Sequence, residues 1–267
     1  MKNRRKLASE YTYYIIPIVN PDGYEYSRKW DRFWRKTRSF NYKNFFCPGV
    51  DLNRNFGYQW NTGGSSKFPC SQVYHGHYAE SEPETQALTK FLKSKSIDLY
   101  LTLHTFGQMW LSVWGYTKDD PSDIADLKEL GDMATDAIRG NSGKTYISGT
   151  SAQILGVASG GSDDWAKEIA GVKYSYTVEL RDDGYYGFIA PAKEIAPTGE
   201  EMHAAITKVA EYLTQLPKTR TSRQYVQVPT SKGRVQYPPG NIRSRRRFSS
   251  IVQRRWQYPT RHSVQKK

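Results

Sequence analysis

Acidic residues are missing from the last 50 positions of this 267-residue sequence, and cysteine occurs only twice. No apolar run is long enough to span a bilayer, so we expect no transmembrane segment. The basic first residues lack the uncharged apolar core of a secretory signal, because charged and polar residues continue as far as Glu10. A hydrophobic content of 37% over this length is sufficient for one substantial α/β domain.

The net charge of +13 comes from one end of the chain. Residues 218–267 hold 14 Lys and Arg, which leaves 25 basic and 26 acidic residues for residues 1–217. Prolines and the absence of any sustained periodicity predict a disordered basic tail over 217–267, after a domain at 1–216. The tail is either a solvated extension or a segment that binds polyanions or an acidic extracellular matrix. RSRR at 243–246 also has the spacing of a processing-protease site.

The two cysteines, Cys47 and Cys70, enclose a stretch rich in Gly, Ser, Asn and Pro. A disulfide closing this loop would reduce the entropy of the unfolded chain, which is worth roughly 3 kcal/mol. It would also imply an oxidising compartment. Two free thiols in a cytosolic protein are the alternative, and the number of cysteines leaves both open.

Apolar patterns of strand and helix type alternate along the first 216 residues. TYYIIPIV at 12–19 predicts a central strand, which the turn signal NPDG ends. Ser81 with Glu84, and Thr198 with Glu201, have the spacing of helix capping boxes. We predict further strands at 97–104 and 174–180, and helices at 81–95, 122–140, 162–171 and 197–216. This order is typical of an open α/β sheet covered on both faces, in which chemistry collects at strand ends.

Three polar residues follow or end apolar segments: His104 after YLTL, Glu179 in YTVELRD and Arg54 in GVDLNRNF. Each has a structural explanation when taken alone. A histidine at a strand end can satisfy a backbone group, and a glutamate beside an arginine can form a surface pair. Their surroundings favour a shared function.

Six motifs surround these residues, and their order and spacing resemble those of the zinc metallocarboxypeptidases of the pancreatic A/B type. The resemblance runs from about Tyr11 to about Leu216. It implies a mixed open sheet between helices, a Cys47–Cys70 disulfide, secretion, and hydrolysis of C-terminal residues from peptides or proteins. The motifs are NPDGYEYSRKWDRFWRKTRS, CPGVDLNRNF, PCSQVYHG, LHTF, ASGGSDDW and YTVELRDDGYYGF.

The resemblance also assigns roles to individual residues. His104 is similar in position to a zinc ligand, Glu179 to the general base and later acid, and Arg35 to the donor that stabilises the oxyanion. Asn53 and Arg54 match the residues that bind the terminal carboxylate, and a planar guanidinium suits a carboxylate better than an ammonium does. Phe188 matches a residue that lines the side-chain pocket.

Asp163 in ASGGSDDW matches the position that sets side-chain preference in this family. A buried carboxylate there would favour a C-terminal Lys or Arg, because a charge in a low-dielectric pocket requires its opposite. The alternative is a helix N-cap, since Ser162, Asp163 and Asp164 all suit the start of a helix.

The sequence departs from the family pattern upstream of residue 12. A catalytic zinc needs three protein ligands, and the family takes two of them from a His-x-x-Glu motif that precedes the NPDG segment. Only about eleven residues precede the predicted strand here, none of them histidine. We therefore expect a domain that is incomplete at its N-terminus and also lacks one carboxylate-binding arginine. The literal His77-x-x-Glu80 lies elsewhere, at the start of a predicted helix, and we interpret it as coincidence.

Two aromatic positions differ as well. Leu155, Gly156 and Val157 lie where the family usually has a mobile tyrosine, and Phe106 lies where a tyrosine is common. Losing one phenolic hydrogen bond would cost about 1 kcal/mol of peptide binding.

Two hypotheses follow. The first is the C-terminal part of a secreted zinc carboxypeptidase. The second is an inactive secreted pseudoenzyme that acts as a binding or matrix-organising module through its basic tail. Nucleic-acid binding by the tail is disfavoured, because a disulfide indicates a compartment other than the cytosol or nucleus.

Overall fold

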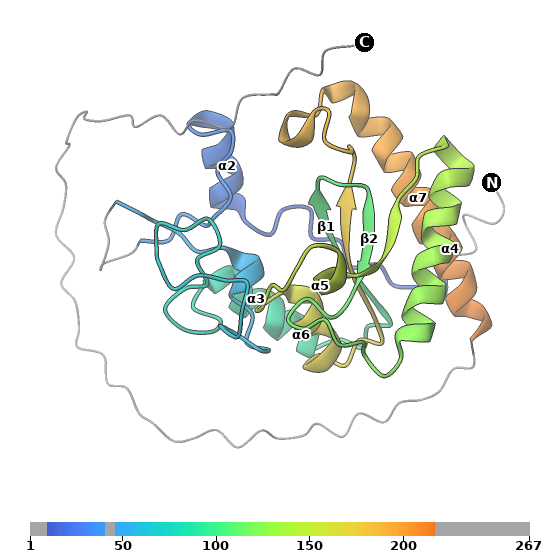
Figure 1. The fold of residues 1–267 in the computed structure, drawn as a ribbon, viewed down its shortest axis with the longest axis horizontal. Coiled ribbons are helices and arrows are strands. Elements are labelled where there is room, and N and C mark those ends of the chain that lie inside the picture. Colours follow the sequence, from blue (N-terminus) through green and yellow to red (C-terminus); the bar gives the residue numbers. More distant parts are fainter. Residues whose placement is uncertain (1–9, 41–45, 217–267) are drawn as a thin grey trace, which may run out of the picture. The chain divides into compact units, whose positions relative to one another are not determined.

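The computed structural model describes residues 10–40 and 46–216 (Figure 1). The predicted tail, with RSRR, lies outside these residues. No helix among them is both long and apolar enough to cross a membrane. The helices are α2 (Pro21–Lys29), α3 (Pro83–Lys93), α4 (Ile124–Ser142), α5 (Ser151–Ile154), α6 (Ser162–Glu168) and α7 (Ile195–Gln215). The strands are β1 (Leu99–Thr105), β2 (Met109–Ser112), β3 (Ile147–Thr150) and β4 (Tyr174–Leu180), and short 3-10 turns cover Leu52–Arg54, Gly187–Ile189 and Ala192–Glu194.

The four strands form one mixed sheet in the order β1-β4-β2-β3. β1 is parallel to β4, and β2 is parallel to β3, whereas β4 and β2 are antiparallel. α4 and α7 pack together on one side of the sheet, and α3 and α6 lie on the other (Figure 1). The predicted mixed open sheet between helices is confirmed.

The alternation of side chains along β4 builds two different faces. Tyr174, Tyr176 and Val178 are buried in the larger core with the apolar residues of α4 and α7. Ser175 and Thr177 point the other way, toward α6. A second, smaller core lies on that side, around Phe56 and the helices α3 and α6.

Helix ends differ in detail from the predictions. α4 continues past Gly140 and ends at Ser142, because Gly143 adopts the left-handed conformation (φ 74°) in which glycine is unstrained. α7 begins at Ile195, and the Thr198 hydroxyl donates back to the Glu194 carbonyl, so the predicted capping box of Thr198 with Glu201 is wrong.

The capping box predicted at Ser81 and Glu84 is also wrong. α3 begins at Pro83 with Glu82 as its N-cap residue. The Ser81 hydroxyl donates to the Glu82 carboxylate instead, at 2.9 Å. The Asn55 side chain accepts a bond from the Glu82 backbone N–H, at 3.1 Å. Asn55, which is distant in the sequence, therefore stabilises the start of α3 in place of the predicted local capping box.

The prediction of a central strand at residues 12–19 is wrong, because these residues form no strand in the structure. Their apolar side chains are exposed, Ile15 to 80% and Ile16 to 49%. The NPDG sequence begins a helix instead of a turn, because the Asn20 side chain accepts a hydrogen bond from the Gly23 N–H and Pro21 occupies the first turn of α2. A strand needs a neighbour, and no described strand pairs with this segment.

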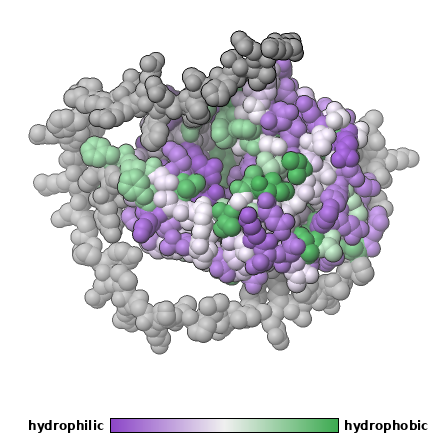
Figure 2. All heavy atoms as spheres, in the orientation of Figure 1, coloured by the Kyte–Doolittle hydropathy of each residue, from purple (hydrophilic) through white to green (hydrophobic). Residues whose placement is uncertain are grey.

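Exposed apolar side chains also occur elsewhere. On the face seen in Figure 2, hydrophobic residues form several separate groups within a mostly hydrophilic surface. A single exposed side chain of this kind is ordinary for a folded protein, whereas a continuous run such as 13–19 requires an explanation.

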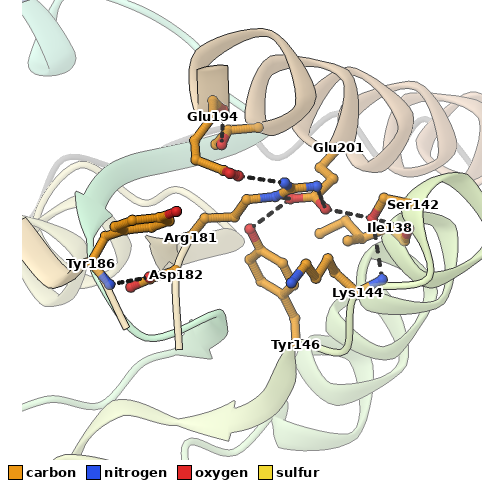
Figure 3. A network of polar contacts seen from close by, with 10 residues as sticks. Ile138, Ser142, Lys144, Tyr146, Arg181, Asp182, Tyr186, Glu194 and Glu201 are labelled. Carbon is orange, nitrogen blue, oxygen red and sulfur yellow. Dashed lines mark hydrogen bonds and ion pairs between the residues drawn. The ribbon is translucent and has the colours of Figure 1, made fainter. Parts of the chain in front are cut away.

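An ion-pair network fixes the end of β4 to the helices (Figure 3). The Arg181 guanidinium binds Glu201 through two nitrogens and Glu194 through a third. Glu201 is fully buried and also accepts bonds from Ser142 and Tyr146. The end of the strand that carries Glu179 is thereby held to both α7 and α4.

Candidate functional site

The site begins with the polar side of two parallel strands. Alternate residues of β1 and β4 face α6, and in the strand register each pairs with a polar residue across the ladder. His104 and Glu179 form the last of these pairs, at the carboxyl ends of the strands. The pairs are Tyr100 with Ser175, Thr102 with Thr177, and His104 with Glu179.

The His104 side chain is held at one nitrogen. Its Nε2 lies 3.0 Å from the Thr102 hydroxyl. Burial lowers the pKa of His104, and the positive charge of Arg35 lowers it further, against the opposite effects of Asp163 and Asp51. The imidazole is therefore neutral at neutral pH, which is the form that binds metals.

The Glu179 carboxyl group is a weaker acid than an ordinary glutamate side chain. Burial raises the pKa of Glu179 to about 7, although the nearby Arg35 acts to lower it. A carboxylate with this pKa can accept and return a proton near neutral pH.

Arg35 is positioned by a residue that the sequence analysis missed. Its Nε and Nη2 both lie 2.9 Å from Asp51 Oδ2, and the Asp51 side chain is buried. The other Asp51 oxygen accepts a bond from the Asn53 backbone N–H. Asp51 therefore connects two predicted site residues, and its position directly before Leu52–Arg54 was the available signal.

Asn53 and Arg54 lie in the 3-10 turn Leu52–Arg54. The Asn53 side-chain oxygen accepts a bond from the Ser162 N–H at 2.9 Å, which joins this turn to α6. Arg54 donates to the Asn53 carbonyl at 2.7 Å. Gly160 (φ 77°) packs against this turn, where a Cβ atom would lie 2.3 Å from the Arg54 carbonyl oxygen.

Asp163 is buried beneath the strands. Its Oδ2 accepts a bond from the Thr177 hydroxyl at 2.9 Å, and its side chain is part of the electrostatic environment of both His104 and Arg54. The N-cap interpretation is wrong, because Gly161 is the N-cap residue of α6 and no side chain caps it. Asp164 serves another purpose, since it accepts bonds from the Gly115 and Tyr116 backbone N–H groups.

Phe188 lies in the 3-10 turn Gly187–Ile189, with 51% of its surface exposed. Its ring contacts Phe106 edge to face, with centroids 4.9 Å apart. Arg32 donates to the Phe188 carbonyl at 2.6 Å. The two phenylalanines place an aromatic wall just beyond the end of β1.

A cavity of about 470 Å³ opens beside the end of β1. Arg35 and His104 line it together with the apolar side chains of Ile18, Trp34 and Leu103. Two of the predicted site residues thus share a cavity with part of the exposed 12–19 segment.

The described residues, 10–40 and 46–216, do not provide the set of ligands that a catalytic zinc ion needs. They contain no group of three or more His, Cys, Asp or Glu side chains that could hold a metal ion, whereas a catalytic zinc takes three protein ligands. The residues present therefore do not fit a zinc ion. His77 and Glu80 have other contacts, with Tyr74 and Thr89 respectively.

The predicted disulfide is present. Cys47 and Cys70 are bonded, with their Cα atoms 4.8 Å apart.

Comparisons with known proteins agree with this architecture. The zinc carboxypeptidase family (peptidase M14) matches residues 2–205. The chain is 43% identical to carboxypeptidase B of Astacus astacus over 209 residues, which is 78% of this chain and 69% of that protein. It is also 43% identical to carboxypeptidase O of Homo sapiens and to carboxypeptidase B of Bos taurus, of which it spans only 55% and 49%.

Solved structures give the same result. Thrombin activatable fibrinolysis inhibitor is similar with a TM-score of 0.77 at 39% identity, over 81% of this chain and 55% of that one. Carboxypeptidase A from Helicoverpa armigera is similar with a TM-score of 0.67 at 37% identity, over 74% of this chain and 50% of that one. The chain spans about half the length of most of these proteins.

Proposed function

Because this chain belongs to the zinc carboxypeptidase family, we propose that it provides the peptide-binding and proton-transfer residues of a metallocarboxypeptidase site. The observation that supports this most directly is the pairing of His104 with Glu179 at the strand ends, with Arg35 acting electrostatically on both. The substrate is the C-terminal end of a peptide or protein.

Recognition of the substrate rests on Asn53 and Arg54. A guanidinium and an amide on one tight turn suit a carboxylate, which accepts two parallel hydrogen bonds. Burial lowers the pKa of Arg54, and Arg35 acts in the same direction, whereas Asp51 and Asp163 oppose them. The group nonetheless stays charged, and its partial burial strengthens its attraction for an anion.

Proton transfer rests on Glu179, which takes the proton of the attacking water and returns it to the leaving amine. Arg35 stabilises the negative charge that forms on the carbonyl oxygen. A complete site would also need a zinc ion to polarise the carbonyl and the water, and His104 would be one of its ligands. The described residues do not complete that set, so this chain alone is expected to bind zinc weakly and to hydrolyse nothing.

Side-chain preference rests on Asp163, which favours a peptide that ends in Lys or Arg. Asp163 is 5% exposed, and among the described residues its carboxylate accepts a hydrogen bond from the Thr177 hydroxyl. A buried anion of this kind is stabilised by an incoming cation.

A binding and a metal measurement test this proposal on the full chain. Isothermal titration with a peptide ending in Lys should show binding that Arg54→Ala weakens at least tenfold. Arg139→Ala, an exposed arginine on α4, should bind like the wild type. Metal analysis should find less than one zinc per chain. Equal binding by both variants would contradict the proposal, and stoichiometric zinc with release of the terminal Lys would contradict the expectation that this chain alone is inactive.

A second candidate function follows from the tail. Residues 218–267 carry 14 basic and no acidic residues, which favours a secreted pseudoenzyme that binds extracellular polyanions. The two functions share one fold and differ in whether the site catalyses peptide hydrolysis.

A further inference from the structure

Residues 46–82 contain no strand and no helix beyond the 3-10 turn that carries Asn53 and Arg54. Hydrogen bonds between distant parts of this segment hold the turn in place. The Asp51 N–H donates to the Tyr74 carbonyl at 2.8 Å, and Arg54 Nε donates to the Gly64 carbonyl at 3.2 Å. The position of the turn therefore depends on the position of residues 64–75.

His75 lies at the centre of these contacts. Its carbonyl accepts a bond from the Asn55 side chain at 2.9 Å and another from the Trp60 indole N–H at 3.0 Å. Its own N–H donates to the Ser66 carbonyl at 3.0 Å. Asn55 directly follows the turn, so the His75 backbone joins the turn to the rest of the segment.

The His75 ring is buried without a polar partner. The residue is 3% exposed, and neither ring nitrogen has a hydrogen-bond partner among the described residues. Its neighbours are aromatic. The Trp60 ring contacts the imidazole at 4.5 Å between centroids, and the Tyr74 ring at 5.9 Å. A neutral imidazole is compatible with these surroundings, whereas a buried imidazolium without an acceptor is costly.

The titratable groups on the surrounding elements do not offset this cost. The Glu80 and Glu82 carboxylates accept bonds from threonine hydroxyls and have no bond to the ring. The Lys36 ammonium lies 5.9 Å from the centroid of the Tyr74 ring, and it has the same charge as an imidazolium. Burial lowers the pKa of His75, against opposite effects of nearby backbone groups. The remaining titratable groups here are Tyr74 and His77, whose side chains contact each other.

We propose that His75 is an acid-sensitive positioning residue, which releases the turn carrying Asn53 and Arg54 when its ring takes up a proton. This inference rests on the proposed function, because the same turn is assigned to the peptide carboxylate. The protonated ring requires water, so the segment opens locally, while the Cys47–Cys70 disulfide keeps it attached. Opening removes the bonds from Asn55 and to Gly64, and Arg54 then loses its orientation.

The direction of the pH dependence follows from the linkage between protonation and opening. Because the pKa of His75 is lowered in the closed segment, the open segment binds protons more readily. The closed form is fully favoured above the ordinary value of 6.5 and loses stability as the pH falls below it. A peptide carboxylate and an arginine both stay charged down to about pH 5. Neither of them accounts for a loss of binding in this range.

Two measurements on the full chain between pH 7.5 and pH 5 test the proposal. Protection factors from hydrogen exchange should fall roughly tenfold at the amides of Asp51, Ser66 and His75 and stay constant in α4. The affinity for a peptide ending in Lys, measured by isothermal titration, should fall by a similar factor. His75→Phe keeps an aromatic ring that cannot titrate, so it should remove most of both effects.

The matched control is His203→Phe, at an exposed position on α7, which should behave like the wild type. Titration of His104 and Glu179 is common to both variants, so the difference between the variants reports on His75. Equal pH dependence in the two variants would overturn the proposal.

The ring itself gives an answer that does not depend on the folding of a variant. An NMR titration of the wild type should place the pKa of His75 below 6.5, and a value at or above 6.5 would overturn the proposal. Opening in acid by a chain that binds no peptide at any pH would contradict the proposed function and leave the acid-sensitive segment established. Equal peptide binding at pH 7.5 and pH 5 would refute this inference and leave the proposed function intact.

Discussion

His104 and Glu179 are cross-strand partners at the carboxyl ends of the parallel strands β1 and β4. The pairing places a neutral imidazole and a carboxyl of pKa about 7 side by side. Neither state is intrinsic to the residue type. Both result from burial at the end of an apolar strand pair, with Arg35 close enough to act on each. The same arrangement predicts how stability depends on pH.

Glu179→Gln should stabilise the protein above neutral pH and have no effect in acid. The folded-state pKa of about 7 lies above the ordinary value of 4.5, so the ionised form is disfavoured on folding. This cost appears as pH rises through 4.5 and is complete above 7. Allowing for partial exposure, we expect a gain of roughly 2 kcal/mol at pH 8 and none at pH 4, measured by urea unfolding. Glu200→Gln, at an exposed position on α7, is the control. Equal stabilisation at both pH values would contradict the assignment.

Arg181→Met should be strongly destabilising. It removes the only cation among the bonded partners of Glu201 that the structure describes, while the carboxylate stays fully buried (Figure 3). Leaving a buried charge without its partner costs roughly 3–5 kcal/mol. Lys128→Met breaks the exposed pair with Asp132 and should cost less than about 0.5 kcal/mol. Thermal and urea unfolding would measure both.

A double variant isolates the cause of this effect. Glu201→Gln in the Arg181→Met background removes the stranded charge, so it should recover part of the lost free energy. No recovery would mean that Arg181 acts through packing and not through its ion pair.

Periodicity predicted the longer elements that pack within the described domain. The strands predicted at 97–104 and 174–180 form β1 and β4, and the four predicted helices form α3, α4, α6 and α7 with shifted ends, because their burial partners are present. TYYIIPIV at 12–19 has an equally strong pattern and forms no strand. An apolar pattern indicates that a segment is suited to a buried position in a sheet. No described strand pairs with residues 12–19, so this segment does not form a strand.

The two capping boxes predicted from local spacing are wrong, because residues distant in the sequence form the hydrogen bonds there instead. Glu201 was expected to cap its own helix, but Arg181, Ser142 and Tyr146 bind it from other elements. The short strands β2 and β3 have four residues each, which is too few for a period to be recognised. For the site, the resemblance supplied the residues, whereas the role of Asp51 follows from its contact with Arg35, and its position directly before Asn53 and Arg54 was the only hint in the sequence.

Removing the disulfide should destabilise the fold without changing its architecture. Cys47 and Cys70 close a loop with a sequence separation of 23, and releasing such a loop adds entropy to the unfolded chain worth roughly 3 kcal/mol. The double variant Cys47→Ser/Cys70→Ser should therefore unfold at lower urea concentration. Reductant should shift the wild type to the same midpoint and leave the variant unchanged. A wild type insensitive to reductant would contradict this account.

Asp163→Ile should exchange the preferred peptide end from Lys to an apolar residue. The substitution removes the buried charge that a cationic side chain would meet. Titration with two peptides that differ only in their last residue, Lys or Leu, measures the preference, and we expect it to reverse. Thr177→Val is the informative control, because it removes the hydroxyl donor to Asp163 and leaves the charge. It should keep the Lys preference, and loss of preference in both variants would assign specificity to packing.

The basic composition of residues 218–267 predicts that the chain is retained on a heparin column and is released by salt. Residues 1–217 have 25 basic and 26 acidic residues, so they offer little net attraction to a polyanion, whereas the next 50 residues have 14 basic and no acidic ones. Deleting residues 218–267 should therefore abolish retention. A full-length variant with those Lys and Arg residues changed to Gln should behave like the deletion, because charge and not length is responsible. If the deletion were still retained, the polyanion would have to bind the domain, and the pseudoenzyme hypothesis would lose the feature that favours it.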